Sequence, residues 1–249
     1  MSRSFILEAS DLTKDFGGVR AVNRVSFNLK EGESIGIIGP NGSGKTTLVN
    51  LISGFIRPDV GEVRFRGKRI TGMMPHRIAQ LGLSRTFQMA RPFYHLPAFK
   101  NLVIPLFSPR VKKLAGGKYG NRDAIALDLL EEVGFERDSA VPYKAASVLP
   151  HGYLKRLELA RSLALRPDLI ILDELFSGLS IAEVASTVPI IEKIQAEGKA
   201  IIMIEHRLRE LFRIVDRVIV LNYGRNIAEG TPKEVMASDE VKGAYLGSE

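Results

Sequence analysis

Residues 34–51 read SIGIIGPNGSGKTTLVNL and place a glycine-rich segment between an apolar run and a helix-compatible run. The segment matches the pattern G-x-x-x-x-G-K-[ST], and a preceding strand with a following helix is the context expected of a phosphate-binding loop, or P-loop. That context favours a P-loop over a glycine-rich turn that binds nothing. The predicted nucleotide-binding residues of the loop are Gly39, Pro40, Asn41, Gly42, Ser43, Gly44, Lys45, Thr46 and Thr47.

The residue types of this loop suit a nucleotide that carries a phosphate chain. Glycines reach positive φ and have no Cβ, so consecutive backbone N–H groups can turn toward phosphate oxygens. Lys45 would place a positive charge at the β- and γ-phosphates, and the Thr46 hydroxyl would bind Mg²⁺. The helix after the loop points its positive end at the same place.

Composition sets the limits of the interpretation. The chain has 249 residues, 45% hydrophobic and 25% charged, which is ordinary for one large or two modest globular domains. No window approaches about 18 uninterrupted apolar residues, and the hydrophobic region in the first ten residues is too short for a secretory signal. We therefore expect a cytosolic chain. Zero Cys excludes disulfides and thiolate metal sites. The net charge of +7 is dispersed, which favours a solvated surface over a specific nucleic-acid partner.

Strands are expected on both sides of the P-loop. Residues 5–12 read as a short strand, and residues 21–29 alternate apolar and polar as a half-buried antiparallel strand does. Between them, Phe16 stands before two glycines in a predicted loop. Its ring either caps a core or offers a face to a nucleobase.

Short elements follow the P-loop helix. Residues 62–66 read as one more strand, and residues 75–81 as a short helix. Residues 83–88 are strand-like and end on Gln88, which by itself would be read as a surface glutamine.

A helical segment then interrupts the strands. Helical periodicity is present over residues 99–106, 122–133 and 154–165, while the basic and Gly-rich residues 109–120 read as a mobile connection. Near its end, residues 149–157 form a predicted Gly-containing turn that leads into an amphipathic helix. We therefore predict a helical subdomain at residues 89–165, inserted into a nucleotide-binding core of residues 1–88 and 166–249.

Two later strands bring polar residues to the expected ligand edge. Residues 169–174, LIILDE, form an apolar strand that ends in two carboxylates. Asp173 can hold Mg²⁺, and Glu174 can orient or deprotonate the water that attacks the γ-phosphate. Residues 200–205 repeat the design and deliver His206, which can donate to the γ-phosphate. A last helix is predicted near residues 231–237 because Thr231 and Pro232 suit its first positions.

The order of these parts resembles the nucleotide-binding subunit of ATP-binding cassette (ABC) transporters over essentially the whole chain. The matching motifs are Walker A at residues 39–46, a Q-loop at Gln88, a signature region at residues 149–153, Walker B at residues 169–174 and a switch histidine at His206. The segments GPNGSGKTTLVNLISGF, LSRTFQ, RLELARSLA and IEHRL resemble the corresponding sequences in the ATPases of branched-chain amino acid importers.

The resemblance implies an α/β P-loop NTPase with a mainly parallel core sheet, an antiparallel β subdomain and an inserted helical subdomain. It implies ATP and Mg²⁺ as cofactors, with Phe16 stacking on the adenine and with Thr46, Gln88 and Asp173 around the metal. Glu174, His206 and Gln88 would be the catalytic residues. It also implies membrane permease subunits as partners, a separate substrate-binding protein, and a peripheral position at the cytoplasmic face of the inner membrane.

The sequence departs from the family pattern where it would meet a second ATP-binding subunit. The family's L-S-G-G-Q is replaced by Leu149, Pro150, His151, Gly152 and Tyr153. The Pro that usually follows the catalytic Glu is Leu175, and the usual Asp of the next loop is Ser180. Because this chain's own P-loop is intact and what it gives to a partner is altered, we expect a heterodimer rather than a homodimer.

One alternative lies within the transporter class, and two belong to other classes of function. An exporter of lipid or polysaccharide is kept, since the permease selects the cargo. A soluble cassette protein acting on nucleic acid or ribosomes would suit the positive charge, but such proteins usually carry two cassettes or long coiled-coil inserts. An independent P-loop kinase or GTPase would leave the signature region and His206 without a role, and no N-K-x-D motif occurs.

Overall fold

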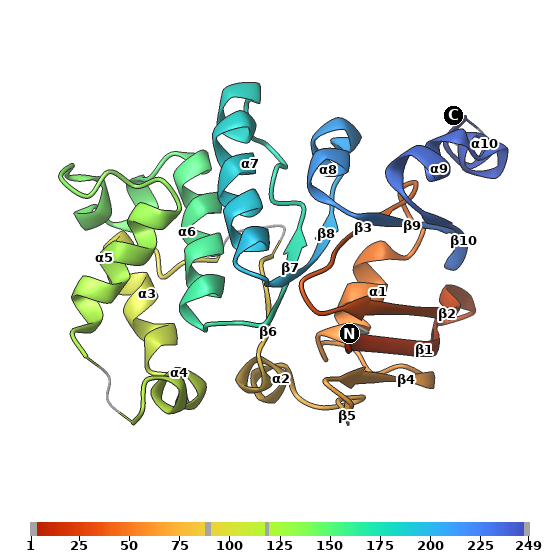
Figure 1. Cartoon of the computed structure of the whole chain (residues 1–249), viewed down its shortest axis with the longest axis horizontal. Helices are drawn as coiled ribbons and strands as arrows, with labels where there is room; N and C mark the ends of the chain where they lie inside the picture. Colours follow the sequence, from red (N-terminus) through yellow and green to blue (C-terminus); the bar gives the residue numbers. More distant parts are fainter. Residues whose placement is uncertain (1–3, 88–90, 118–119, 247–249) are drawn as a thin grey trace.

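The computed structural model describes residues 4–87, 91–117 and 120–246, and its centre is a six-stranded sheet (Figure 1). The strand order is β10-β9-β3-β8-β7-β6. Its strands are β3 (Ser34–Ile38), β6 (Leu83–Arg85), β7 (Leu169–Asp173), β8 (Ala200–Ile204), β9 (Arg217–Asn222) and β10 (Arg225–Gly230). Neighbouring strands from β9 to β6 are parallel, and β10 is antiparallel to β9. The predicted mainly parallel core sheet is therefore confirmed.

A second sheet is antiparallel, as predicted, and has the order β2-β1-β4-β5. Its strands are β1 (Phe5–Phe16), β2 (Val19–Lys30), β4 (Val60–Phe65) and β5 (Lys68–Arg69). The predicted loop around Phe16 is wrong, because β1 continues to Phe16, which pairs with Val19. Gly17 and Gly18 have φ of 50° and 92°, the conformation of a two-residue hairpin turn that lets the strands pair to their ends.

Helices pack on the sheets, and two helices form the C-terminal end of the described chain. They are α1 (Lys45–Ile52), α2 (Pro75–Leu81), α7 (Ile181–Ala196), α8 (Leu208–Ile214), α9 (Pro232–Ala237) and α10 (Asp239–Leu246). The predicted start of α9 is confirmed: the Thr231 side chain accepts from the Glu234 N–H in a capping box, and Pro232 is the first helical residue. The sequence reasoning did not identify α7, α8 or α10.

The segment between β6 and β7 is helical, as expected. It contains α3 (Ala98–Leu106), α4 (Pro109–Leu114), α5 (Arg122–Glu132) and α6 (His151–Ala164), with short 3-10 turns at Val141–Tyr143 and Ala146–Val148. In Figure 1, α3, α5 and α6 form the left part of the molecule, while α1 and the antiparallel sheet lie on the other side of β7. The boundaries of a subdomain at residues 89–165 stay a prediction.

The interpretation of residues 109–120 as a mobile connection is wrong where α4 forms. Pro109 is its first residue, where the missing N–H costs nothing, and Val111 is buried. The Arg110 guanidinium donates to the backbone oxygen of Arg166 and pairs with Asp168 at 2.8 Å. These contacts tie α4 to the start of β7.

The core lies on both faces of the six-stranded sheet. Every residue of β3, β7 and β8 is buried, and successive side chains of these strands join two different hydrophobic clusters. One cluster includes α6, α7 and α8, and the other includes α1 and the antiparallel sheet. Continuous burial on both faces explains why these strands are uninterrupted apolar runs.

No helix in the described part of the chain is long and apolar enough to cross a membrane.

Candidate functional site

The predicted P-loop joins β3 to α1, and its backbone is packed too closely for side chains at two glycines. A Cβ on Gly39 would lie 2.1 Å from the Leu221 carbonyl oxygen. A Cβ on Gly44, which caps α1 with φ of 102°, would lie 2.3 Å from the Ala21 carbonyl oxygen. Glycine is therefore required at both positions by the strand β9 and by the β2 backbone.

Lys45 is the first residue of α1 and is only 7% exposed. Its Nζ donates to the Gly39 carbonyl oxygen at 2.8 Å and to the Pro40 carbonyl oxygen at 2.9 Å. Burial lowers the pKa of the Lys45 ammonium, while the carboxylates of Glu174 and Asp173 act in the opposite direction. The positive charge is thus held inside the loop before any ligand binds.

One cavity of about 200 Å³ brings most of the predicted site together. It is lined by Ala21, Asn41, Gly42, Ser43, Gly44, Lys45, Thr46, Thr47, Glu174 and His206. Residues 41–46 of the Walker A motif therefore share one cavity with Glu174 and His206. Phe16, Gly39, Pro40 and Asp173 are not among the lining residues.

Glu174 and His206 leave the ends of two neighbouring parallel strands and meet. The Glu174 Oε1 lies 3.1 Å from the His206 Nε2. Glu174 directly follows β7 with φ of 50°, and its N–H donates to the Ile204 carbonyl oxygen at 2.9 Å, which holds its backbone beside the end of β8. A carboxylate oriented by an imidazole in this way can hold and polarise a water molecule.

Asp173 is the last residue of β7 and is buried. Its Oδ2 accepts from the Arg85 Nη2 at 2.7 Å, and its backbone N–H donates to the Thr86 Oγ1 at 3.1 Å. Carboxylate and hydroxyl oxygens are the ligands that Mg²⁺ prefers, so Asp173 and Thr46 have the right chemistry for it.

Two charged residues behind Glu174 were missed by the sequence reasoning. The buried Lys155 Nζ, on α6, donates to the Glu174 carbonyl oxygen at 3.0 Å. The buried Glu205 Oε1 accepts from the Phe176 N–H at 2.8 Å, and burial raises the pKa of Glu205 to about 7. Two signals in the sequence could have indicated these residues: Lys155 is a charged residue within an amphipathic helix, and Glu205 directly follows an apolar strand.

The structure excludes one of the two interpretations of the Phe16 ring, that it caps the core. Its side chain is 45% exposed, so it does not cap the core. The Lys14 Nζ lies 5.5 Å from the centroid of its ring. Stacking on adenine stays a prediction, and Gln88 lies outside the described residues.

The signature region is more helical than predicted. Pro150 caps α6, so His151, Gly152 and Tyr153 form the first turn of the helix and do not belong to a preceding turn. The His151 Nε2 lies 3.2 Å from the Ser177 carbonyl oxygen, and the Tyr153 ring packs edge-on against Phe135. These five positions, Leu149 included, do not line the nucleotide cavity of their own chain.

A Cβ on Gly152 would lie 2.2 Å from the Glu183 Oε1, on α7. Ser180, which stands where the family has Asp, caps α7 in a capping box with Glu183. The start of α6 is therefore packed against the start of α7, and a side chain at Gly152 would displace Glu183.

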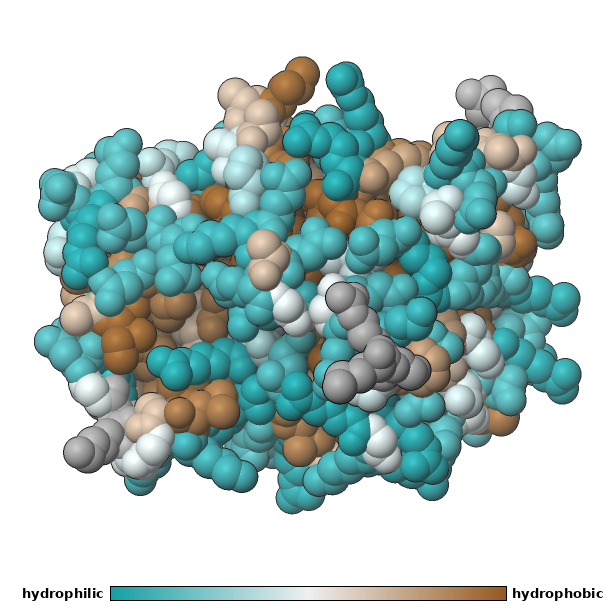
Figure 2. All heavy atoms as spheres, viewed as in Figure 1, coloured by the Kyte–Doolittle hydropathy of each residue, from teal (hydrophilic) through white to brown (hydrophobic). Residues whose placement is uncertain are grey.

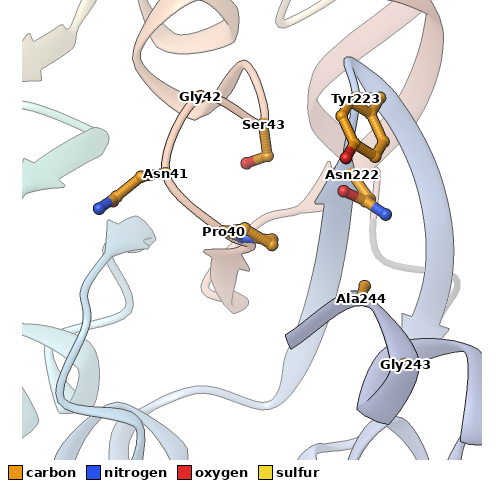
Figure 3. A pocket seen from close by; sticks show the side chains of 8 residues that line it. All are labelled: Pro40, Asn41, Gly42, Ser43, Asn222, Tyr223, Gly243 and Ala244. Atoms are coloured by element: carbon orange, nitrogen blue, oxygen red, sulfur yellow. The ribbon is translucent and has the colours of Figure 1, made fainter. Parts of the chain in front are cut away.

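The other side of the P-loop faces the end of the described chain (Figure 3). A cavity of about 140 Å³ there is lined by Pro40, Asn41, Gly42, Ser43, Asn222, Tyr223, Gly243 and Ala244. Tyr245 of α10 forms a hydrogen bond with the backbone of Gly39. Helix α10 and the β9–β10 turn thus support the loop from behind.

A P-loop that faces a carboxylate and a histidine across one cavity defines a P-loop ATPase. The family model described as ABC transporter matches residues 22–177, and the chain belongs to this family. A second model, described as Branched-chain amino acid ATP-binding cassette transporter, matches residues 225–249.

Similar proteins match over nearly the whole chain. The high-affinity branched-chain amino acid transport ATP-binding protein BraF of Pseudomonas aeruginosa is 36% identical, over 99% of each chain. LivG of Salmonella typhimurium, with the same description, is 34% identical over 97% of this chain and 98% of its own. The solved structure of an ABC transporter ATP-binding cassette in its ADP conformation has a TM-score of 0.84 and 30% identity, over 98% of this chain and 100% of its own. The solved structure of a nucleotide-free ATP-binding cassette from an ABC transporter has a TM-score of 0.85 and 30% identity, over 98% of this chain and 100% of its own.

The first prediction tests the assignment of Glu174. Glu174→Gln keeps the shape of the side chain but removes its basicity, so ATP turnover should fall by on the order of 10²-fold or more. ATP affinity, measured by calorimetry, should be nearly unchanged. As a comparison, Lys45→Ala should weaken ATP binding itself, because it removes the charge held inside the loop. Steady-state hydrolysis that is unchanged in Glu174→Gln would exclude this role.

The second prediction concerns pH. The pKa of Glu205 is raised from 4.5 to about 7, so folding favours its protonated form. The stability that this proton provides is complete below about pH 4.5 and is lost as the pH rises through about 7. Glu205→Gln keeps an acceptor for the Phe176 N–H and removes the charge. It should therefore be more stable than the wild type above pH 7, by on the order of 3 kcal/mol.

Urea denaturation of both proteins at about pH 5 and about pH 8 measures this difference. The advantage of Glu205→Gln should be much smaller at the lower pH. Equal differences at the two pH values would mean that Glu205 does not titrate in this range.

Proposed function

We propose that this ATPase drives the import of branched-chain amino acids, or of similar small amino-acid or amide solutes, through membrane permease subunits. The observation that carries the catalytic part is the Glu174–His206 pair, which faces Lys45 in the P-loop cavity. The cargo is proposed from the descriptions of the relatives, which are named as branched-chain amino acid transport ATP-binding proteins.

The predicted site residues, on and around the cavity, divide the work on ATP. The loop N–H groups and Lys45 bind the phosphates, and the exposed Phe16 stacks on the adenine. The Thr46 hydroxyl and the Asp173 carboxylate, with Gln88, would hold Mg²⁺, which would neutralise phosphate charge. Glu174 orients and deprotonates the attacking water, and His206 donates to the γ-phosphate.

The helical part is proposed as the surface that meets the permease at the cytoplasmic face of the inner membrane. Figure 2 shows hydrophilic side chains over most of this face of the molecule, with hydrophobic ones over the helices at the left and also near the top centre. The exposed large apolar side chains in the described residues of this part are Phe93, Tyr94, Leu96, Ile104, Phe107, Leu114, Tyr143 and Val148. Apolar side chains on a protein surface mark interaction sites when they gather in one region. A separate substrate-binding protein would select the cargo on the other side of the membrane.

Co-purification tests the proposal. The tagged chain is expressed in its native cell, isolated from detergent-solubilised membranes, and its partners are identified by mass spectrometry. We expect permease subunits of an amino acid importer. Recovery with the permease of a lipid or polysaccharide exporter would favour that alternative, and recovery without any membrane protein would contradict the transporter role.

The third prediction separates this function from a role on nucleic acid. If the charge of +7 is dispersed over the surface, DNA or RNA binding should be weak and without sequence preference. Binding measured by fluorescence anisotropy should disappear as salt rises from about 50 to 200 mM. Tight binding that survives the higher salt would put the nucleic-acid function first.

We propose further that the ATP-binding partner is a paralogous subunit. A signature serine donates to the γ-phosphate of the opposite subunit in this family, and Pro150 has neither a hydroxyl nor an N–H to donate. In a homodimer both sites would lose this donor. In a heterodimer the intact P-loop of this chain would face a complete signature, and only the partner's site would be impaired.

The fourth prediction follows from this asymmetry. A charge-assisted hydrogen bond to phosphate is worth roughly 1.5–3 kcal/mol, about ten- to a hundredfold in rate. The chain alone should therefore hydrolyse ATP at least about tenfold more slowly than the complex with its co-purified partner. Glu174→Gln in the complex should remove more than half of the activity, whereas the matching substitution in the partner should remove less. Equal rates for the chain alone and the complex would contradict the heterodimer.

A further inference from the structure

Arg85 is a buried arginine beside the carboxylate that is proposed to bind the metal. It is the last residue of β6, and its side chain is 6% exposed, while that of Asp173 is 5% exposed. The Arg85 Nη2 lies 2.7 Å from the Asp173 Oδ2. A charge-assisted bond of this length between two buried groups fixes the direction of both side chains.

The same guanidinium is anchored on the P-loop helix. Its Nη1 donates to the Asn50 Oδ1 at 2.7 Å and to the Ser53 Oγ at 3.0 Å. Asn50 lies in the last turn of α1, and Ser53 caps the helix at its C-terminal end. Arg85 therefore joins three elements: the helix that follows the P-loop, the strand that ends in Asp173, and the strand that leads toward Gln88.

Two aromatic rings lie beside the guanidinium. The Arg85 Cζ lies 5.7 Å from the centroid of Phe55 and 5.3 Å from that of Phe87. The two rings pack edge-to-face with centroids 5.4 Å apart. Lysine cannot replace a planar fork with several donors, because its ammonium is a compact point charge.

Among the described residues, the hydrogen bonds to the Asp173 carboxylate involve one of its two oxygens. Among the described residues, Arg85 is the side chain that donates to this carboxylate, and it does so at Oδ2. The other oxygen, Oδ1, accepts no hydrogen bond from these residues. Partners behind a ligating carboxylate orient it, and their loss typically reduces metal affinity or activity by about 10–100-fold.

We propose that Arg85 is a positioning residue that holds the Asp173 carboxylate in the orientation that binds Mg²⁺ and ties this orientation to the P-loop helix. The inference builds on the proposed function, in which Asp173 binds the metal. A buried ion pair that only stabilised the fold would affect thermal stability but not the response to Mg²⁺.

Arg85→Lys is the sharpest variant, because the positive charge stays while the fork is lost. ATP affinity is measured by calorimetry with Mg²⁺ and with EDTA, and the half-saturating Mg²⁺ concentration is measured for hydrolysis. We expect this concentration to rise about tenfold. The affinity for ATP in EDTA should change by less than about twofold, and the gain in affinity on adding Mg²⁺ should shrink.

Arg110→Lys is the matched control. Arg110 is also largely buried, at 12% exposed, and pairs with Asp168 at 2.8 Å, at the opposite end of β7 from Asp173. It should lower the melting temperature without changing the response to Mg²⁺. An equal change of the half-saturating Mg²⁺ concentration in the two lysine variants would mean that Arg85 forms only a structural ion pair, and it would overturn the inference.

Asp173→Asn separates failure of the inference from failure of the proposed function. If it leaves the Mg²⁺ response unchanged, the metal assignment itself is wrong. If it shifts the response while Arg85→Lys does not, only the role of Arg85 is wrong. Should Arg85→Lys fail to fold, Asn50→Ala removes an anchor of the guanidinium without touching Asp173. A smaller rise in the same direction, about threefold, is then expected, and no rise would overturn the inference.

Discussion

The register of the three central parallel strands is the constraint on which the site depends. Ile204 of β8 is paired with Ile37 of β3 on one side and with Asp173 of β7 on the other. The strands therefore end at the same level, and the P-loop, Glu174 and His206 leave the sheet at one edge. A shift of β7 by one residue would turn the Asp173 side chain to the opposite face and move Glu174 away from His206.

The burial that fixes this register also requires that charged groups near the edge have partners. Lys155 donates to the Glu174 carbonyl oxygen, Glu205 accepts from the Phe176 N–H, and Arg85 pairs with Asp173. Removing Arg85 or Asp173 alone would leave an uncompensated buried charge, which costs more than the ion pair contributes to stability. The packing behind the cavity therefore restricts how the catalytic side chains can move.

The sequence predicts the parts of this structure that follow from local patterns. Apolar runs that end in charged residues indicated β7 and β8, and the spacing of Gly and Lys indicated the P-loop. The hairpin at Phe16 and the helix at Pro109 were missed, because each depends on backbone conformation or contacts with distant residues. The bond between Arg85 and Asp173 joins residues 88 positions apart, so no local pattern in the sequence could reveal it.

The most direct measurement is ATP-driven uptake in proteoliposomes that contain this chain with its co-purified permease, with the proposed substrate-binding protein added. With Mg²⁺ and ATP present, radiolabelled leucine, isoleucine or valine should accumulate on the side of the membrane that carries the ATPase, opposite the substrate-binding protein. Uptake should be lost when Glu174→Gln replaces the wild-type chain. Uptake that continues at the wild-type rate with Glu174→Gln, or that needs no ATP, would contradict the role of this cavity in transport.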